Sequence, residues 1–222
     1  MTRTEAIARI NQGLGFRSAG LPLESNIILM LQEAQRNLER GKTLPKFLLV
    51  EDFALSLLVG THTVAKPTGF LRESDETKIR FYPLNSTKPR FLDRRFLIDA
   101  LQANSHVTAE NPEAPEQPAG PSVYVIRQSV IDFIVTADTN YTLYLDYYKA
   151  GTVLTTDAEN IWLANAPEWL IGEAGVRIAR DLRDGEAVAT FTEMRQMARA
   201  AIFAEDITAE TASGPLQMGA NQ

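Results

Sequence analysis

The stretch YTLYLDYY, residues 141–148, constrains the fold more than any other because its side chains alternate along the chain. The residues of one parity are apolar or aromatic: Tyr141, Leu143, Leu145 and Tyr147. The residues of the other parity are amphipathic: Thr142, Tyr144, Asp146 and Tyr148. Side chains at alternate positions of a strand share one face, and aromatic residues suit a half-buried pleated surface. We therefore predict a strand with one core face and a second face that meets water or another protein.

A strand needs partners, and the sequence offers several. Residues 137–140 supply turn residues, ADTN, so residues 130–148 read as a β-hairpin. Three further strand-like segments are predicted near 47–52, 61–65 and 77–83. FALSLL, residues 53–58, fits either a strand or a helical turn, because periodicity alone does not separate the two.

Helices are predicted at both ends of the chain. Thr2-x-x-Glu5 is a capping-box pattern, and a second apolar stripe runs from Glu24 to Arg40, followed by Gly41. Near the carboxyl end, Asn165-x-x-Glu168 and Thr190-x-x-Glu193 each predict a helix start. A short helix is also expected from Pro89 to Leu101.

These elements predict an α+β fold. A bundle of amino- and carboxyl-terminal helices (residues 1–41 and 165–205) accompanies a small antiparallel β-sheet region in the middle (residues 44–150). Residues 104–121 are acidic and proline-rich, with few apolar residues, and are predicted to form a mobile loop inside that region. Residues 206–222 are predicted to be a flexible tail. We expect the whole of residues 1–222 to form one domain.

Composition excludes several classes of protein. The 222 residues contain no cysteine, which excludes disulfides and thiolate metal sites. The start of the chain lacks the apolar core of a secretory signal, and the apolar runs are too short for a membrane span. Residues 1–103 carry 15 Lys/Arg and 11 Asp/Glu, whereas residues 104–222 carry 7 and 17. The difference in charge between the two halves either arises by chance, with both halves solvated, or helps copies of the chain to pair in one orientation.

No set of residues indicates catalysis, a cofactor or a metal. The two histidines, His62 and His106, have no ligand neighbours at usable spacing. GLGFRSAG, residues 13–20, lacks the Lys-Ser/Thr of a phosphate-binding loop and reads as a helix stop. Carboxylate pairs such as Glu51–Asp52 and Asp181/Asp184 occur in any acidic chain, and sequence does not give the distance between their carboxyl groups.

A basic cluster is the strongest charged feature. KPRFLDRR, residues 88–95, contains Arg94 and Arg95 and one aromatic residue. The first interpretation is a solvated basic face, the second a contact with the acidic half of a neighbouring copy, and a third a phosphate-binding patch. Trp162 and Trp169 are interpreted as core anchors or as interface residues.

The order of elements and one motif-rich region resemble a known family. The features are YTLYLDYY at 141–148, Thr155–Asp157, the Asn160–Leu163 stretch NIWL, and the helix led by Pro167. In this the chain resembles the head–tail adaptor proteins of tailed bacteriophages, of the short-tailed type represented by the phage SU10 adaptor, over about residues 1–205. The acidic segment 104–121 is not part of the family pattern.

The resemblance implies a structural protein of the virion neck, assembled in the host bacterial cytoplasm. It implies a ring of copies, twelve as a rule, that contacts the portal protein and a tail or nozzle protein and lets genomic DNA pass without sequence-specific binding. The partner-contacting residues predicted are Tyr144 and Tyr148 from the amphipathic strand face, Arg94 and Arg95 from the basic cluster, and, from the resemblance, the tail residues Ile207, Leu216 and Met218. A soluble bacterial protein-binding module is the alternative, and a carboxylate-dependent hydrolase is a weaker one.

Overall fold

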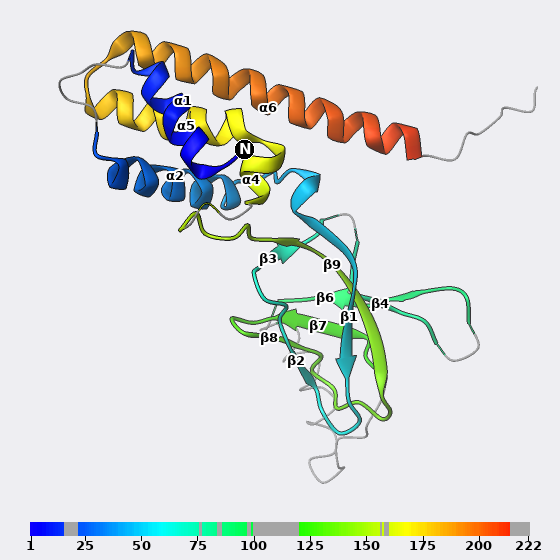
Figure 1. Cartoon of the computed structure of the whole chain (residues 1–222). Helices are drawn as coiled ribbons and strands as arrows, with labels where there is room; N and C mark the ends of the chain where they lie inside the picture. The colour runs from blue at the N-terminus through cyan, green and yellow to red at the C-terminus, as the bar shows by residue number, and fades with distance from the viewer. Residues whose placement is uncertain are drawn as a thin grey trace, which may run out of the picture. The chain divides into compact units, whose positions relative to one another are not determined.

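The computed structural model describes residues 1–15, 22–75, 77–83, 86–96, 99, 120–155, 157 and 160–213, with the side chains of 208–213 left out. The chain divides into two compact units (Figure 1). Met1–Leu48 and Gly151–Gln222 form the helical unit, and Leu49–Ala150 form the β unit. The predicted α+β class is confirmed, with helices from both ends of the chain and sheets in the middle. That the two units act as one domain stays a prediction.

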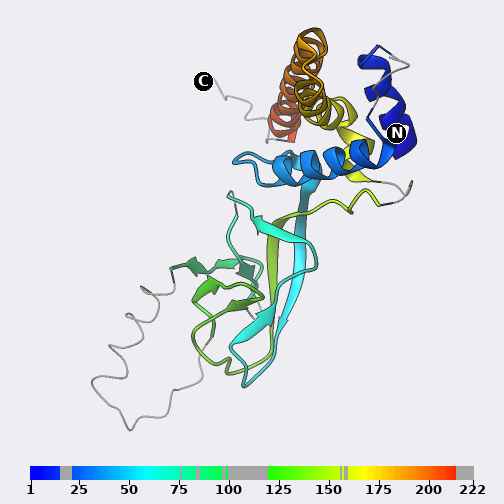
Figure 2. The same ribbon diagram turned by 90° about the vertical axis from the view of Figure 1, so that its left-hand side faces the viewer.

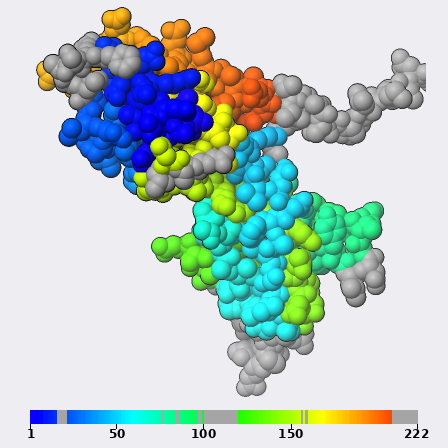
Figure 3. Space-filling model, in the orientation of Figure 1, coloured from blue at the N-terminus to red at the C-terminus, as the bar shows by residue number. Residues whose placement is uncertain are grey.

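The helical unit contains α1, α2, a 3₁₀ turn η1, α4, α5 and α6, with bounds Arg3–Gly13, Glu24–Glu39, Lys46–Leu48, Ile161–Asn165, Pro167–Asp181 and Gly185–Ser213. The predicted capping box is present at α1, because the side chains of Thr2 and Glu5 each bond the other's backbone N–H. Apolar stripes of α1 and α2 are buried as expected, including Ile10 and Leu31. Figure 3 shows α1, in dark blue, on the outside of the helical unit.

α5 and α6 pack closely as an antiparallel pair (Figure 1). The fully buried ring of Phe191 on α6 lies against Gly175 of α5 and Gly13 of α1, where a Cβ atom would overlap the ring. The turn between α5 and α6 places Arg183 in the left-handed region at φ 54°. There the Asp184 N–H bonds the Ala179 carbonyl and the Arg183 N–H bonds the Arg180 carbonyl, the two bonds of a Schellman motif.

Both predicted caps in the carboxyl half are wrong. α5 begins at Pro167 with Ala166 as its cap, and the Asn165 side chain instead bonds the Ile161 carbonyl one turn back. α6 begins at Gly185, where the Asp184 carboxylate accepts the Ala187 N–H. Thr190 therefore lies inside α6, and its hydroxyl bonds the Glu186 carbonyl.

The predicted flexible tail is wrong over its first part. α6 continues to Ser213 because its sequence after Gly185, rich in Ala and Glu, contains no further Gly and no Pro before residue 214. Residues 214–222 lie outside the described residues.

The described residues of the β unit form nine strands in two sheets. They are β1 Leu49–Leu57, β2 Thr63–Ala65, β3 Phe70–Glu73, β4 Arg80–Phe81, β5 Arg90–Phe91, β6 Asp93–Arg94, β7 Val123–Ile126, β8 Val130–Asp132 and β9 Tyr141–Lys149. One sheet has the order β1-β9-β4-β5, with β3 also on β9, and the other has the order β2-β8-β7-β6. All pairs are antiparallel except β6 with β7.

The core of the β unit forms around β9, which lies beside β1 along its length (Figure 2). The predicted core parity is confirmed at Leu143, Leu145 and Tyr147, which are buried. The core also takes in residues from both sheets, such as Tyr124 and Phe133. The segment FALSLL is a strand, since all but its last residue lies in β1.

The predicted hairpin over 130–148 is wrong. β8 pairs with β2 and β7, whereas β9 pairs with β1, β3 and β4, so the two strands lie in different sheets. The chain bends between them at Ile134, which has a positive φ of 67°. The hairpin that does form joins β7 to β8, where the Arg127 N–H bonds the Val130 carbonyl.

The helix predicted from Pro89 to Leu101 is wrong over residues 89–96, whereas Asp99 has a helical backbone. Residues 90–91 form β5 on one sheet, and residues 93–94 form β6 on the other. Leu92 between them is fully buried, and its N–H bonds the Ile79 carbonyl. Pairing with two distant strands outweighs the local helical pattern. The predicted loop 104–121 lies outside the described residues except for Gly120 and Pro121.

Candidate partner-binding surfaces

A groove rich in tyrosine lies at the edge of the β1-β9-β4-β5 sheet. This tyrosine groove has a volume of about 530 Å³, and its lining includes Phe81, Tyr82, Arg90, Gly120, Tyr141 and Tyr144. The rings of Tyr82 and Tyr144 meet edge to face at 5.8 Å, and those of Phe81 and Tyr141 at 5.3 Å. Tyr82 is 48% exposed. Exposed aromatic rings flanked by a cation are typical of surfaces that bind another chain.

The structure places the predicted residues Tyr144 and Tyr148 on the same face of β9. Both are half-buried, in line with the predicted amphipathic face. Tyr144 lines the tyrosine groove, whereas the Tyr148 ring lies under the Arg72 guanidinium at 5.3 Å. Tyr148 is therefore held within its own sheet, and only Tyr144 belongs to a groove.

A second groove contains the last two arginines of the basic cluster. This arginine groove, of about 810 Å³, is lined by Arg94, Arg95, Phe96, Val125, Ile126 and Arg127. Phe96 is 81% exposed. Arg95 forms no ion pair with any described carboxylate, whereas Arg127 Nη2 lies 2.5 Å from Asp132 Oδ2. Cations beside exposed apolar side chains suit a partner that carries both carboxylates and apolar groups.

A buried carboxylate lies behind Arg94. Glu73 is buried, accepts a hydrogen bond from the Tyr124 hydroxyl, and lies 3.3 Å from Arg94. Burial raises the pKa of the Glu73 carboxyl above its usual range, although the bonds from Tyr124 and Arg94 oppose this. Burial and the neighbouring carboxylate also raise the pKa of the Tyr124 hydroxyl. Arg94 therefore connects the arginine groove to the core of the β unit through its ion pair with Glu73. The residues around Arg94 in the sequence did not indicate this ion pair.

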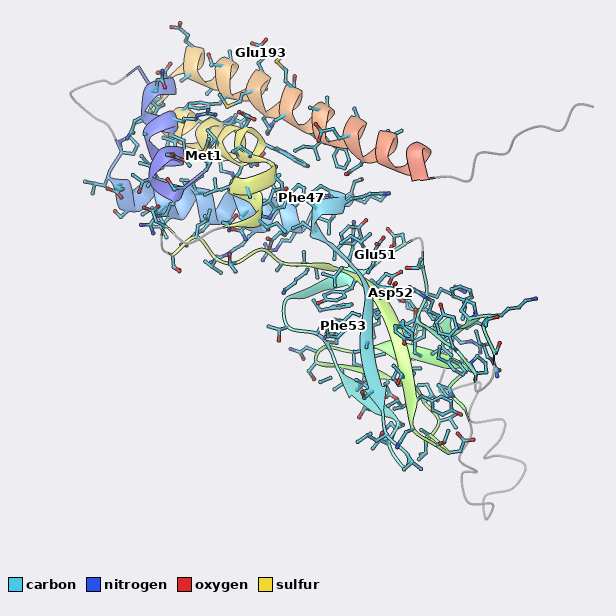
Figure 4. The ribbon with its side chains drawn as sticks, turned by 45° about the vertical axis from the view of Figure 1, so that its right-hand side comes forward. Met1, Phe47, Glu51, Asp52, Phe53 and Glu193 are labelled. Atoms are coloured by element: carbon cyan, nitrogen blue, oxygen red, sulfur yellow. The ribbon has the colours of Figure 1, made fainter. Side chains whose placement is uncertain are left out.

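A second network holds the start of β1. The Asp146 carboxylate accepts hydrogen bonds from Arg80 at 2.9 Å, Thr77 at 2.7 Å and the Asp52 N–H at 2.7 Å. Burial raises the pKa of Asp146, but these bonds outweigh it and lower that pKa below its usual range. Asp52 sits at φ 53° where the pairing of β1 with β9 shifts register. Figure 4 labels Glu51, Asp52 and Phe53 at this end of β1.

Glu51 and Asp52, the carboxylate pair singled out in the sequence, therefore belong to a β-bulge. Arg80 pairs with both Asp52 and Asp146, which makes the cluster a structural network of one cation and two carboxylates. The other pair is also structural, because Asp184 caps α6 while Asp181 ends α5.

The helical unit contains a polar network that sequence reasoning missed. The Gln35 side chain donates to Glu39 and to the carbonyls of Gly151 and Thr152. Glu39 also accepts the Trp162 indole N–H at 3.0 Å, and Asn160 caps α4. Gln35 directly follows Ala34 of the apolar stripe of α2, and this position is the one sign in the sequence of the inward polar contact that its burial shows. The network ties α2 to residues 151–162.

Both tryptophans are buried in the helical core. Their rings meet edge to face at 5.8 Å, with Phe47 on Trp162 and Phe203 on Trp169. This confirms the core interpretation over the interface one.

The third predicted surface lies at the carboxyl end. Ile207 on α6 is 62% exposed, whereas Leu216 and Met218 lie outside the described residues. Met197, on the same helix, is 67% exposed.

The histidines considered as possible metal ligands do not form a metal site within the described residues. His62 is exposed, and His106 lies outside the described residues. Within the described ranges, no three His, Cys, Asp or Glu residues cluster as metal ligands. No helix in that part of the chain is long and apolar enough to cross a membrane.

Comparison with known proteins gives one family assignment and no curated relative. The family model described as SU10 adaptor protein matches residues 1–219. No curated protein matches the chain.

Proposed function

The chain belongs to the SU10 adaptor protein family, and from this premise we propose that it is a structural head–tail adaptor of a tailed bacteriophage. In this proposal, copies assemble into a ring of twelve beneath the portal protein. The ring extends the DNA channel and offers a platform to a tail or nozzle protein. The observation that carries the proposal is the match to the family model over nearly the whole chain.

The exposed surfaces support this role. The tyrosine and arginine grooves each combine aromatic rings with cations, as interfaces between proteins do. We assign Tyr144, Tyr148, Arg94 and Arg95 to contacts between copies or with the tail. We assign Ile207, Leu216 and Met218 to the portal. The proposed role is non-enzymatic, and it places the protein in the virion neck after assembly in the host cytoplasm.

The mass of the protein alone and with the portal protein tests the proposal. We expect a single copy in isolation and a ring on the portal, measured by native mass spectrometry and negative-stain microscopy. Leu216→Ser with Met218→Ser should weaken portal docking and leave the circular dichroism spectrum unchanged. A chain that stays a single copy in the presence of portal would contradict the adaptor and favour the soluble binding module.

Arg95→Glu tests the contact between copies. It should reduce ring formation on the portal, because it replaces a cation that pairs with no described carboxylate by an anion in the arginine groove. Lys42→Glu, an exposed change of the same charge in the helical unit, is the control and should leave the ring intact. Equal ring yields for both variants would remove the arginine groove from the interface.

A further inference from the structure

The outer face of α2 carries two exposed cations and one exposed apolar side chain. Leu29 is 53% exposed, and the exposed residues Arg36 and Arg40 follow it at helical spacing. The buried residues of α2 lie on the opposite side of the helix. Arg36 and Arg40 form no ion pair with any described carboxylate, whereas Glu33, on the same face, pairs with Arg177. The α2 face, defined by Leu29, Arg36 and Arg40, therefore offers two cations to a partner.

The outer face of α6 has the opposite charge. This α6 face consists of Glu186, Glu193 and Met197, which are exposed at helical spacing, and Met197 is 67% exposed. Figure 4 shows Glu193 on the side of α6 that points away from the other helices. Neither glutamate pairs with a described cation. The arginines of α6 are turned toward other groups, because Arg195 pairs with a carboxylate of α5 and Arg199 lies over an aromatic ring of α6.

The two faces lie on opposite sides of the helical unit. α5 packs on both α2 and α6 and lies between them (Figure 1). Each face lies opposite the buried stripe of its own helix, so both faces point away from α5. A molecule whose opposite sides are complementary pairs head to tail with further copies, and such contacts close into a ring where the rotation permits. The α2 face of one copy therefore suits the α6 face of a second copy.

The spacing of the side chains on the two faces matches when the helices are antiparallel. The apolar residue and the last cation of the α2 face are eleven residues apart, and so are the apolar residue and the first glutamate of the α6 face. Eleven residues span about 16 Å of helix. With Leu29 against Met197 in antiparallel helices, Arg40 lies opposite Glu186. The remaining cation and glutamate are offset by three residues, less than one turn. In parallel helices, the same apolar contact would carry Arg40 away from both glutamates.

From the opposite charges, the matched spacing and the exposed apolar pair, we propose that the α2 face of one copy packs antiparallel on the α6 face of the next. Leu29 packs on Met197, and two arginine–glutamate pairs lie on one side of this apolar contact. Because each copy uses both faces, the contact is heterologous and continues around a ring. The inference rests on the ring of the proposed function and identifies one contact within it.

Charge reversal of one face at a time tests the contact, with rings on the portal protein measured by native mass spectrometry. The first variant carries Arg36→Glu and Arg40→Glu, and the second carries Glu186→Arg and Glu193→Arg. Each variant alone should give about tenfold fewer rings than the wild type, because both of its faces then have the same sign of charge. An equal mixture should restore the ring with both variants in equal numbers, since each face of one variant then meets an oppositely charged face of the other.

A matched control and a folding check complete the design. Lys88→Glu with Lys149→Glu reverses two exposed cations of the β unit and should leave the ring yield unchanged. Circular dichroism of each variant checks its fold. Single-face variants that form rings as the wild type does, or a mixture that restores no rings, would overturn this contact, whereas the wild-type ring would still support the adaptor function. A wild type that forms no ring on the portal would overturn both the adaptor function and this contact.

Discussion

Asp146 occupies a position of β9 that the alternation of the sequence assigns to the outward face, yet its side chain is buried. Its carboxylate is buried, but three donors surround it, so the charge is held where the strand pattern predicts a solvated face. Glu73 is the opposite case: burial dominates, and its pKa rises. The two acids therefore make opposite contributions to how stability depends on pH.

Asp146→Asn should lower the free energy of unfolding at neutral pH by about 3 kcal/mol, because it leaves Arg80 with one carboxylate partner fewer in a buried network. The pKa of Asp146 is depressed in the folded state. Its contribution to stability is therefore present above the pKa of the unfolded state, and it is lost as the pH falls through the pKa of the folded state. Urea unfolding at several pH values should show the cost of the substitution shrinking in acid. Asp75→Asn, an exposed control, should have little effect.

Glu73→Gln should give the reverse pH trend. The pKa of Glu73 is raised in the folded state. Its contribution to stability is therefore complete below the pKa of the unfolded state, and it is lost as the pH rises through the pKa of the folded state. The stability of the wild type relative to the variant should therefore fall as the pH rises above the ordinary carboxyl pKa of about 4. A relative stability that climbs over that range in urea titrations would refute the assignment.

At the scale of elements, the sequence correctly predicted the features that depend on local interactions. The capping box at Thr2 and the apolar stripe of α2 were predicted correctly, since both depend on neighbours within a few residues. The hairpin over 130–148 and the helix at Pro89 failed, because pairing with strands far away in sequence decides those segments. Of the site residues, Tyr144 and Arg94 were named from alternation and charge, but the grooves that hold them depend on that same distant pairing.

The α5–α6 pair depends on a close approach that no periodicity predicts. Gly175→Ala should lower the free energy of unfolding by about 2 kcal/mol, because its Cβ would overlap the buried Phe191 ring. Gly185→Ala is the matched control, since a Cβ there meets no atom within 4 Å. Thermal unfolding of both variants checks the difference, and a Gly175→Ala protein as stable as the control would show that the helices can separate without cost.

At the scale of the whole molecule, family membership and exposed surfaces lead to the same proposal. The described residues hold grooves with aromatic and cationic walls, and their acids are engaged in caps, bulges and core networks wherever the sequence suggested a catalytic pair. These features support the proposed adaptor role.

A cryo-EM reconstruction of the neck of particles from the phage that encodes this chain tests the adaptor role most directly. We predict twelve copies in a ring between portal and tail, with the arginine groove or the end of α6 in contact with a neighbouring protein. A neck built without this chain, or one in which it stands alone and touches neither portal nor tail, would contradict the account.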